Sequence, residues 1–555
     1  MEAINSASRL LRRVILESET FYAARPAVLP PLSFGRVNDG RPIASQALLF
    51  RLPIELVQEV VAYLDTADLR SLALVDRDCR QLARSRLFTG VVLDYTDGKW
   101  ALLDKLSHHE ARSRRDSGGA TEGHSIGACI RRVTVAAQSI RVRDRYKALS
   151  STDENTSKEE SAMHDIACSY YGKYLPNIVE ALRFSLPNLD ELIWVDRIEL
   201  PQYMLTAISS LPIRRLDLHG IQLSLDYEYQ LPPPEQQRWA LRSLDLGTMS
   251  YPRTDWRDRV VNKFCLAILE AAAPTLERLS WRDYQGTKLS FGTSAIRFPK
   301  LRTLLLDTYH MPDDVVLDTF FPPDVENRVL RSVSIKVSSP HAREFLARRG
   351  HIRGLESLRL DLDTFDCPPD ARTTDAVFLS ANPQLKSLTL NVRRPEQLTD
   401  TLLPLLPSEF KFLTTLVVYF TPRSSGHDLS RNPEPLVAIS RLTTLTTLWI
   451  AGGKHYYWTS SVRAAIATLS PLRNLTRLAL PRGPRASLPI LRVKDKYRER
   501  IGHFVGLYVK AFKELRWVYL EGLVYRVVGN MIVFEGGFTY YSHERAWESP
   551  EWRLW

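Results

Sequence analysis

The hexapeptides LESLRL (residues 355–360) and LKSLTL (residues 385–390) are two copies of one pattern that recurs along most of the chain. The pattern is Leu-x-x-Leu-x-Leu, with Ile, Val or Trp sometimes in place of Leu. It begins twelve times, at Leu189, Ile213, Leu241, Leu276, Leu301, Leu330, Leu355, Leu385, Leu413, Leu445, Leu475 and Leu515. Successive starts are 24 to 40 residues apart. Self-similarity of this kind predicts a repeat architecture.

The last two apolar positions of each hexad are two residues apart, so they point to the same face of a β-strand. Stretches with helical character lie between hexads, such as NKFCLAILEAAAP (262–274), DTLLPLLPSEF (400–410) and SSVRAAIATLS (460–470). One strand–helix unit cannot bury its own apolar face, and neighbouring units must therefore stack. The sequence predicts an α/β fold over residues 171–522, a curved solenoid with a parallel sheet on its concave side.

A different pattern precedes the repeats, in LFRLPIELVQEVVAYLDTADLRSLALVDRDCRQLARSRLF (49–88). Val57, Val60, Val61 and Leu64 recur at i, i+3, i+4 and i+7, which predicts an amphipathic helix, and Pro53 suits its first turn. Two more short helices are expected, with apolar residues Leu69, Leu72 and Ala73 on the second and Val75, Cys79 and Leu82 on the third. Three helices in about 40 residues bury little core, so some apolar surface should be covered by a partner or by the next domain.

The remaining segments have weaker patterns. Residues 1–47 are rich in proline and read as a loose leader, and residues 523–555 as a C-terminal cap. Residues 91–170 are expected to be a linker with two mobile insertions, SHHEARSRRDSGGATEGHS (107–125) and SSTDENTSKEESA (150–162), because both are dense in Ser and charge. Between them IRRVTV (130–135) is predicted to be an isolated strand.

The composition argues against several classes of protein. The formal net charge of +11 comes from arginines scattered through the sequence, which argues against a nucleic-acid partner. Five cysteines without a Cys-x-x-Cys pair predict neither a zinc knuckle nor a disulfide framework. No apolar run reaches the roughly 18 residues of a membrane span, and we expect a cytoplasmic or nuclear protein, or one found in both.

Signatures of catalysis are also missing. His108 and His109 are adjacent and cannot share a helical face as a His-Glu-x-x-His zinc site requires. Gly452, Gly453 and Lys454 look like the end of a phosphate loop, but Leu448 stands where its first glycine should be. We expect no catalytic residue, metal or cofactor, and interpret the chain as a binding protein.

The segment from Leu52 to Phe88 resembles the F-box, a short motif whose pattern is Leu-Pro, a Leu closing the first helix, an Asp-Leu pair and a Val. Those places hold Leu52 and Pro53, Leu64, Asp68 and Leu69, and Val75. Cys79 stands where the family usually has a core Trp, which makes adaptor affinity less certain. The resemblance implies an adaptor-binding surface formed or supported by Leu52, Pro53, Val57, Leu64, Leu69 and Val75.

The hexads resemble leucine-rich repeats of the F-box type, but they lack the family's Asn or Cys three places after the last Leu, so irregular turns are expected. Together the resemblances imply a substrate-recognition subunit of a cullin-RING (SCF-type) ubiquitin ligase. The F-box would bind a Skp-type adaptor and the repeats a protein substrate. An alternative is a repeat scaffold without a ligase link, whose N-terminal helices only cap the solenoid.

The concave face offers a candidate substrate site. The residue between the last two apolar positions of a hexad, and the one after the last, point away from the core. In early repeats these positions are charged or polar, whereas later ones carry large aromatics, and the candidates are Tyr419, Trp449, Trp517 and Tyr519. Exposed aromatics are typical of binding hot spots. The alternative is that VYRVV and MIVFEGG, after residue 522, form a hairpin that covers Trp517 or Tyr519.

Overall fold

The structure is a computed structural model in which the chain forms two compact units. The first is built on Val28–Thr287 with Phe291–Pro299, and the second on Lys300–Trp555. The structure describes residues 29, 32–94, 97–116, 125–136, 172, 174–195, 200–223, 229–232, 239–249, 255–283, 296–308, 314–321, 330–336, 340–361, 371–392, 402–420, 434–451, 462–480, 495–520, 523–529 and 531–537.

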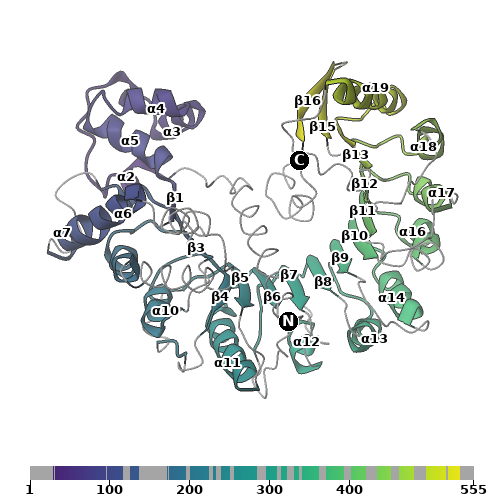
Figure 1. Cartoon of the computed structure of the whole chain (residues 1–555), viewed down its shortest axis with the longest axis horizontal. Coiled ribbons are helices and arrows are strands. Elements are labelled where there is room, and N and C mark those ends of the chain that lie inside the picture. The colour runs from purple at the N-terminus through teal and green to yellow at the C-terminus, as the bar shows by residue number, and fades with distance from the viewer. Residues whose placement is uncertain are drawn as a thin grey trace, which may run out of the picture. The chain divides into compact units, whose positions relative to one another are not determined.

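The first unit begins with a helical module and continues into a parallel sheet (Figure 1). Its strands, each paired with the next in parallel register, are β1 (Gly90–Leu93), β2 (Arg132–Val135), β3 (Glu191–Trp194), β4 (Arg215–Gln222), β5 (Ser243–Met249) and β6 (Arg278–Asp283). Its helices are α2 (Phe34–Val37), η1 (Leu48–Arg51), α3 (Ile54–Tyr63), α4 (Thr66–Leu72), α5 (Arg77–Leu87), α6 (Asp97–Asp104), η2 (Lys105–Glu110), α7 (Ala111–Asp116), η3 (Gly127–Cys129), α10 (Gln202–Ser209) and α11 (Asp255–Ala272).

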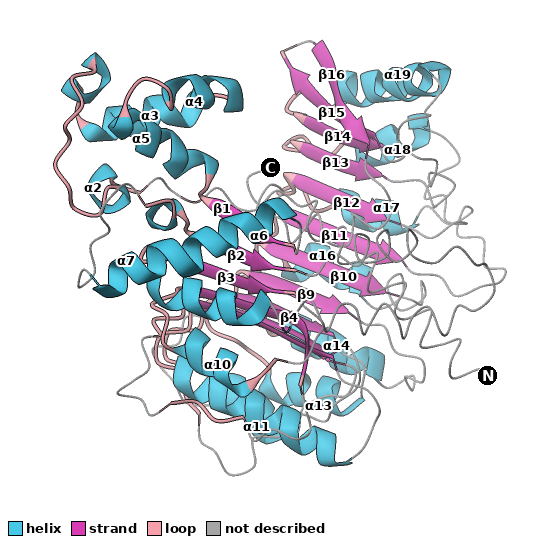
Figure 2. Cartoon of the chain, turned by 60° about the vertical axis from the view of Figure 1, so that its left-hand side comes forward, coloured by secondary structure: helices cyan, strands magenta, loops and turns pink. Residues whose placement is uncertain are grey.

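The second unit is a longer run of strands in the same style, seen side by side in Figure 2. Parallel strands are β7 (Thr303–Thr308), β8 (Ser332–Lys336), β9 (Ser357–Asp361), β10 (Ser387–Val392), β11 (Thr415–Phe420), β12 (Thr447–Ala451), β13 (Arg477–Leu480) and β14 (Trp517–Leu520). The helices between them are α12 (Asp314–Phe320), α13 (Pro340–Arg349), α14 (Ala371–Ser380), α16 (Leu403–Glu409), α17 (Glu434–Ser440), α18 (Val462–Leu469) and α19 (Asp495–Ala511). They lie along one face of the sheet (Figure 1).

All twelve predicted hexads are strands, and each strand begins at the third residue of its hexad. Leu355, Leu358 and Leu360 show why, because the first, fourth and sixth residues point to the helices and are at most 1% exposed. The core is therefore a stack of leucine layers, one layer for each repeat. The other face of each strand is free of helices among the described residues, and we call it the helix-free face.

A hairpin closes the second unit. β15 (Leu523–Val528) pairs antiparallel with β14, and β16 (Met531–Gly537) pairs antiparallel with β15. Gly529 adopts a φ of 59°, which only glycine tolerates easily, at the turn between these two strands. The hairpin that the sequence analysis gave as an alternative is thus present, and it covers the end of the sheet beside β14.

Residues between the helical module and the first predicted hexad differ from expectation. The segment IRRVTV is not an isolated strand, because β2 pairs with both β1 and β3. Residues 107–116 of the first predicted insertion are helical, in η2 and α7, while residues 117–124 and all of 150–162 lie outside the described residues. The stack of strands therefore begins with β1 (Gly90–Leu93), where the helical segment expected over residues 48–90 meets the expected linker of residues 91–170.

Parallel strands that start at one hexad position, with helices along one face and a leucine layer per repeat, form a leucine-rich-repeat solenoid, as predicted. Among the described residues, none of the helices combines the length and the apolar character needed to cross a membrane.

Candidate functional site

The N-terminal helices begin where the sequence supplies caps. The Asp65 carboxylate accepts the backbone amides of Ala67 and Asp68 at 2.8 and 2.9 Å, which fixes the start of α4. Asp76 does the same for α5 by accepting the Cys79 amide at 2.7 Å. The third helix begins at Arg77, so Val75, expected on that helix, precedes it.

These helices share a small core with a segment that precedes them. This core contains Phe34, Val57, Val61, Leu69, Leu82 and Ala83, all buried. Phe34 comes from α2 and its ring lies 5.4 Å from that of Phe50. Cys79 is 1% exposed, and burial raises the pKa of its thiol to about 11. A thiol that stays protonated is a small apolar filler here.

Several large apolar side chains of the same module remain exposed to solvent. On α3, Leu56, Val60 and Tyr63 are 47%, 44% and 84% exposed at positions i, i+4 and i+7, so they share one face. Exposed residues outside α3 are Ile43, Leu48, Leu52, Leu74 and Val75. α3 is thus apolar on two sides, one packed on the module's core and one open. Clustered exposed apolar residues mark a protein interaction surface.

The segment before α3 is tied to the module by hydrogen bonds. The Asp78 carboxylate accepts the amides of Ala44 and Ser45, both at 2.7 Å. The Gln81 side chain donates to the Val37 carbonyl at 2.9 Å and to the Ser125 carbonyl at 2.7 Å. Residues 32–47, expected to be part of a loose leader, are folded against the helices. Periodicity could not predict this, because the hydrogen-bond partners lie far apart in the sequence.

A buried polar network joins the module to the first repeats. Arg114 donates to Asp39 at 2.8 Å, and the Glu110 carboxylate accepts the amides of Ile126 and Gly127 at 2.9 and 3.0 Å. The Asn188 side chain donates to the carbonyl of Arg36 at 3.1 Å and to that of Ala128 at 2.8 Å. Buried hydrogen bonds between residues far apart in the sequence favour one geometry. The apolar surface of α3 is therefore carried on a rigid base.

The helix-free face of the second unit changes character along the sheet. One row of aligned residues consists of Leu305, Ser334, Arg359, Thr389, Val417, Trp449, Ala479, Tyr519 and Val524. A second row lies two residues earlier on each parallel strand and two residues later on the antiparallel strand β15. It consists of Thr303, Ser332, Ser357, Ser387, Thr415, Thr447, Arg477, Trp517 and Arg526. Polar residues thus give way to apolar and aromatic ones toward the C-terminal end.

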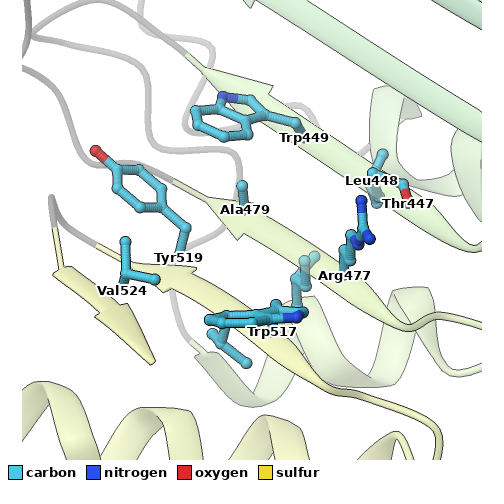
Figure 3. Close-up of a pocket in the computed structure, with 10 residues that line it drawn as sticks. Thr447, Leu448, Trp449, Arg477, Ala479, Trp517, Tyr519 and Val524 are labelled. Atoms are coloured by element: carbon cyan, nitrogen blue, oxygen red, sulfur yellow. The ribbon is translucent and has the colours of Figure 1, made fainter. Parts of the chain in front are cut away.

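Two aromatic rings stack at this end of the face (Figure 3). The rings of Trp449 and Tyr519 are 5.0 Å apart with an interplanar angle of 18°. They come from β12 and β14 and meet over Ala479, whose small side chain on the strand between leaves room for them. Val417 and Val524 complete this buried cluster, and Tyr419 and Trp517 pack against it half-buried. We call this set the aromatic cluster.

The helix-free face of the first unit carries carboxylates instead. Asp217 on β4 and Asp245 on β5 are aligned neighbours. Asp217 is fully buried, and its carboxylate oxygens accept no hydrogen bond from the described part of the chain. Burial, reinforced by the charge of Asp245, raises its pKa to about 8. Arg215 lies 4.0 Å from Asp217, and Arg282 lies 3.6 Å from Asp245.

Comparison with known families settles the identity of the helical module. The model of the F-box domain matches residues 49–89. These residues are an F-box domain. F-box domains bind Skp-type adaptors of cullin-RING ubiquitin ligases and are generally not catalytic, so the module gives the chain a role in adaptor binding. The repeats behind the F-box domain are of a kind that binds proteins.

Comparisons of the whole chain add little. A search of curated proteins found no match. Among solved structures, the chain is similar to an internalin from Listeria monocytogenes at 14% sequence identity, with a TM-score of 0.27. That similarity covers 54% of this chain and 76% of the internalin chain.

The residues predicted for adaptor binding fall into two groups in the F-box domain. Leu52, Pro53 and Val75 are exposed, whereas Val57 and Leu69 belong to its core and Leu64 packs against that core. The first group can touch a partner and the second can only support the surface. Periodicity missed Leu56 and Tyr63 because it selects one stripe per helix, and α3 has two.

The four aromatics predicted for substrate binding are brought together, but they are less exposed than the sequence suggested. Trp449 and Tyr519 are 2% and 3% exposed, and Tyr419 and Trp517 are half-buried. Arg477 lines a recess together with Trp449, Trp517 and Tyr519, and it was not among the candidates. The alternation that selected Trp517 also selects Arg477, which occupies the same hexad position one strand earlier.

No side chains among the described residues assemble a metal site, since none of their His, Cys, Asp and Glu residues form a group of three or more. His108 is 3.5 Å from Asp104, one helical turn away, and both side chains are about half exposed.

Proposed function

We propose that the chain is a substrate-recognition subunit of a cullin-RING ubiquitin ligase of the SCF type. Its F-box domain binds the Skp-type adaptor, and its leucine-rich repeats hold a protein substrate. The observation that carries this proposal is the second apolar face of α3, where Leu56, Val60 and Tyr63 are exposed on a domain whose core is already complete.

The chain itself makes and breaks no bond in this mechanism. The adaptor joins it to a cullin and a RING subunit, and the repeats hold the substrate so that a lysine of the substrate meets the ubiquitin thioester. The rate then comes from high effective concentration. The polar network of Glu110, Arg114 and Asn188 supports this role, because proximity is useful only if the adaptor and the first repeats keep a fixed geometry.

Substrate binding is proposed for the C-terminal repeats, at the aromatic cluster. Tyr419 and Trp517 offer half-buried ring surface there, and Trp449 and Tyr519 give it a rigid apolar floor. Aromatic residues provide large contact area at low cost in side-chain entropy.

Adaptor binding is tested by changing exposed residues that the fold does not need. The double variant Leu56→Glu, Val60→Glu should lose capture of the purified Skp-type adaptor while melting like the parent. The double variant Leu52→Ala, Pro53→Ala should weaken capture in the same assay. Val377→Glu is a matched control, because Val377 is a 54% exposed apolar residue on α14 of the second unit.

Adaptor capture by the α3 double variant at the parent level would contradict the proposed surface. If the unmodified chain failed to capture the adaptor, the proposal would fall and a repeat scaffold without a ligase link would be favoured.

A further inference from the structure

Arg477 is a half-buried cation at the end of the helix-free face of the second unit. It lies between Thr447 and Trp517 in one aligned row. Among the described residues no carboxylate forms an ion pair with its guanidinium, and burial lowers its pKa without any opposing charge. A partly desolvated cation is stabilised by an anion that takes the place of the lost water.

The surroundings of Arg477 are apolar and recessed. The recess has an empty volume of about 430 Å³, part of it open to solvent, and it is lined by Trp449, Ala479, Trp517, Tyr519 and Val524 among others (Figure 3). Electrostatic attraction is stronger in such surroundings than in water.

The described strand residues around Arg477 carry no negative charge on the helix-free face. Among the described residues that face the helix-free side from β11 to β15, the charged ones are Arg477 and Arg526, both positive. The Arg526 guanidinium is exposed and lies 5.8 Å from the centre of the Trp517 ring. The end of the face is therefore complementary to an anion with an apolar neighbour.

We infer that this recess binds the carboxylate of an aspartate or glutamate in an extended segment of a partner protein, with an apolar neighbour of that residue packed on Trp517. The inference rests on the proposed function, in which the partner is the substrate. It names the class of segment that the repeats select.

The row that contains Arg477 supports an extended segment. Six half-buried hydroxyl side chains lead toward it, one per strand: Thr303, Ser332, Ser357, Ser387, Thr415 and Thr447. Hydroxyls both donate and accept, so this row can bond the backbone of a chain crossing the strands. One half-buried guanidinium balances the single charge of a carboxylate, whereas a phosphate carries nearly two charges.

The test uses the full chain and fluorescein-labelled peptides of nine residues. Each peptide is made of Gly and Ser with one Leu and one Glu, separated by one to three residues, and its counterparts carry Gln, Lys or phosphoserine in place of Glu. Fluorescence anisotropy should show that the best Glu peptide binds at least tenfold tighter than its Gln counterpart. Arg477→Gln should abolish that difference, and Arg477→Glu should reverse the preference toward Lys.

Arg473→Gln is the matched control, because Arg473 is exposed in the turn before β13 and off the helix-free face. It should bind as the parent does, and all variants should melt with the parent. Failure of every peptide to bind, or equal binding of the Glu and Gln peptides, would overturn the inference. If the phosphoserine peptide bound tenfold tighter than the Glu peptide, the inferred carboxylate ligand would be wrong and a phosphate would take its place.

Two further measurements distinguish a partner segment from a segment of this chain, and the recess from the F-box domain. Binding that appears only after removal of residues 538–555 would overturn the assignment to a partner and point to the end of this chain as the occupant. Adaptor capture reports on the proposed function alone. Arg477→Gln should leave it unchanged, so loss of peptide binding with intact capture concerns the recess only.

Discussion

The helix-free faces of the two units have the same parallel-strand backbone but differ in the side chains that they carry. At the same hexad position, β4 and β5 of the first unit carry Asp217 and Asp245, whereas β12 and β14 of the second carry Trp449 and Tyr519. In both units the fourth hexad residue is buried among leucines. The leucines therefore fix the strand, and the residues between them are free to define a binding surface.

The two faces also differ in how their charges are balanced. In the first unit Arg282 lies 3.6 Å from Asp245, and Asp217 is fully buried beside it. In the second unit Arg477 has no carboxylate partner among the described residues. A face whose charges are paired with one another attracts a charged partner protein less than a face with an unpaired cation does. This difference favours the second unit for binding an acidic partner.

The largest effect is expected where the two units are alike. Leu216→Asp and Leu358→Asp both place a charge in the leucine core, and each should cost several kcal/mol in the free energy of unfolding. Thermal melting and urea titration would show it. Ser357→Asp is the control, because Ser357 is half-buried on the helix-free face, next to Leu358 in sequence. Parent-like melting of Leu358→Asp would show that the inward assignment of the hexads is wrong.

The next effect belongs to the first unit, which contains the F-box domain. A Cβ at Gly127 would lie 2.0 Å from the Ser185 carbonyl oxygen and 2.9 Å from the Glu110 carboxylate. Since backbone must move, Gly127→Ala should destabilise this unit by about 3 kcal/mol. Gly98→Ala is the control, because a Cβ at Gly98 in α6 meets nothing within 4 Å. Equal stability of the two variants would contradict a rigid joint.

The aromatic cluster should give a somewhat smaller loss, confined to the second unit. Trp449→Ala removes a ring that is 2% exposed and stacked on Tyr519, and it should cost about 2 to 3 kcal/mol. Thr389→Ala, at the same row position two strands earlier, should cost less than about 0.5 kcal/mol. If Trp449→Ala left the free energy of unfolding unchanged, the ring would contribute little to the packing of the aromatic cluster. Trp449 would then not form a rigid apolar base for substrate binding.

Much of the fold could be predicted because leucine periodicity is local. Each hexad carries its own strand signal, and all twelve are strands. β1 and β2 were less visible because Phe88, Val91, Ile130 and Val133 replace the leucines in FTGVVL and IRRVTV. Helix formation in residues 107–116 depends on Glu110 and Arg114, whose partners are up to 75 residues away. Tertiary contacts of that range leave no pattern in a sequence window.

The candidate sites were predictable in part for the same reason. Alternation along a strand places Trp449 and Tyr519 on one face, which the structure brings together. It does not tell how deeply they are buried, because that depends on Ala479 between them and on the hairpin beside β14. In the F-box domain, periodicity located the stripe of Val57 and Val61 and missed the exposed face of Leu56 and Tyr63.

The last effect concerns the buried carboxylate of the first unit, and it depends on pH. The pKa of Asp217 is raised to about 8 in the folded chain, well above the value near 4 of an unfolded carboxyl. Between these two values the folded state binds more protons than the unfolded state, so stability falls as pH rises from about 4 to about 8. The cost is absent below the lower value and complete above the upper one.

Asp217→Asn removes the titrating group and should therefore abolish this loss. We expect the variant to melt with the parent near pH 4 and to gain on it steadily up to pH 8, where its melting temperature should be higher by about 3 °C or more. Asp68→Asn, which changes an exposed carboxyl on α4, should follow the parent at every pH. If Asp217→Asn and the parent ran parallel across this range, the carboxylate would be ionised without cost. The charged helix-free face of the first unit would then cost no more free energy of unfolding than the apolar face of the second unit does.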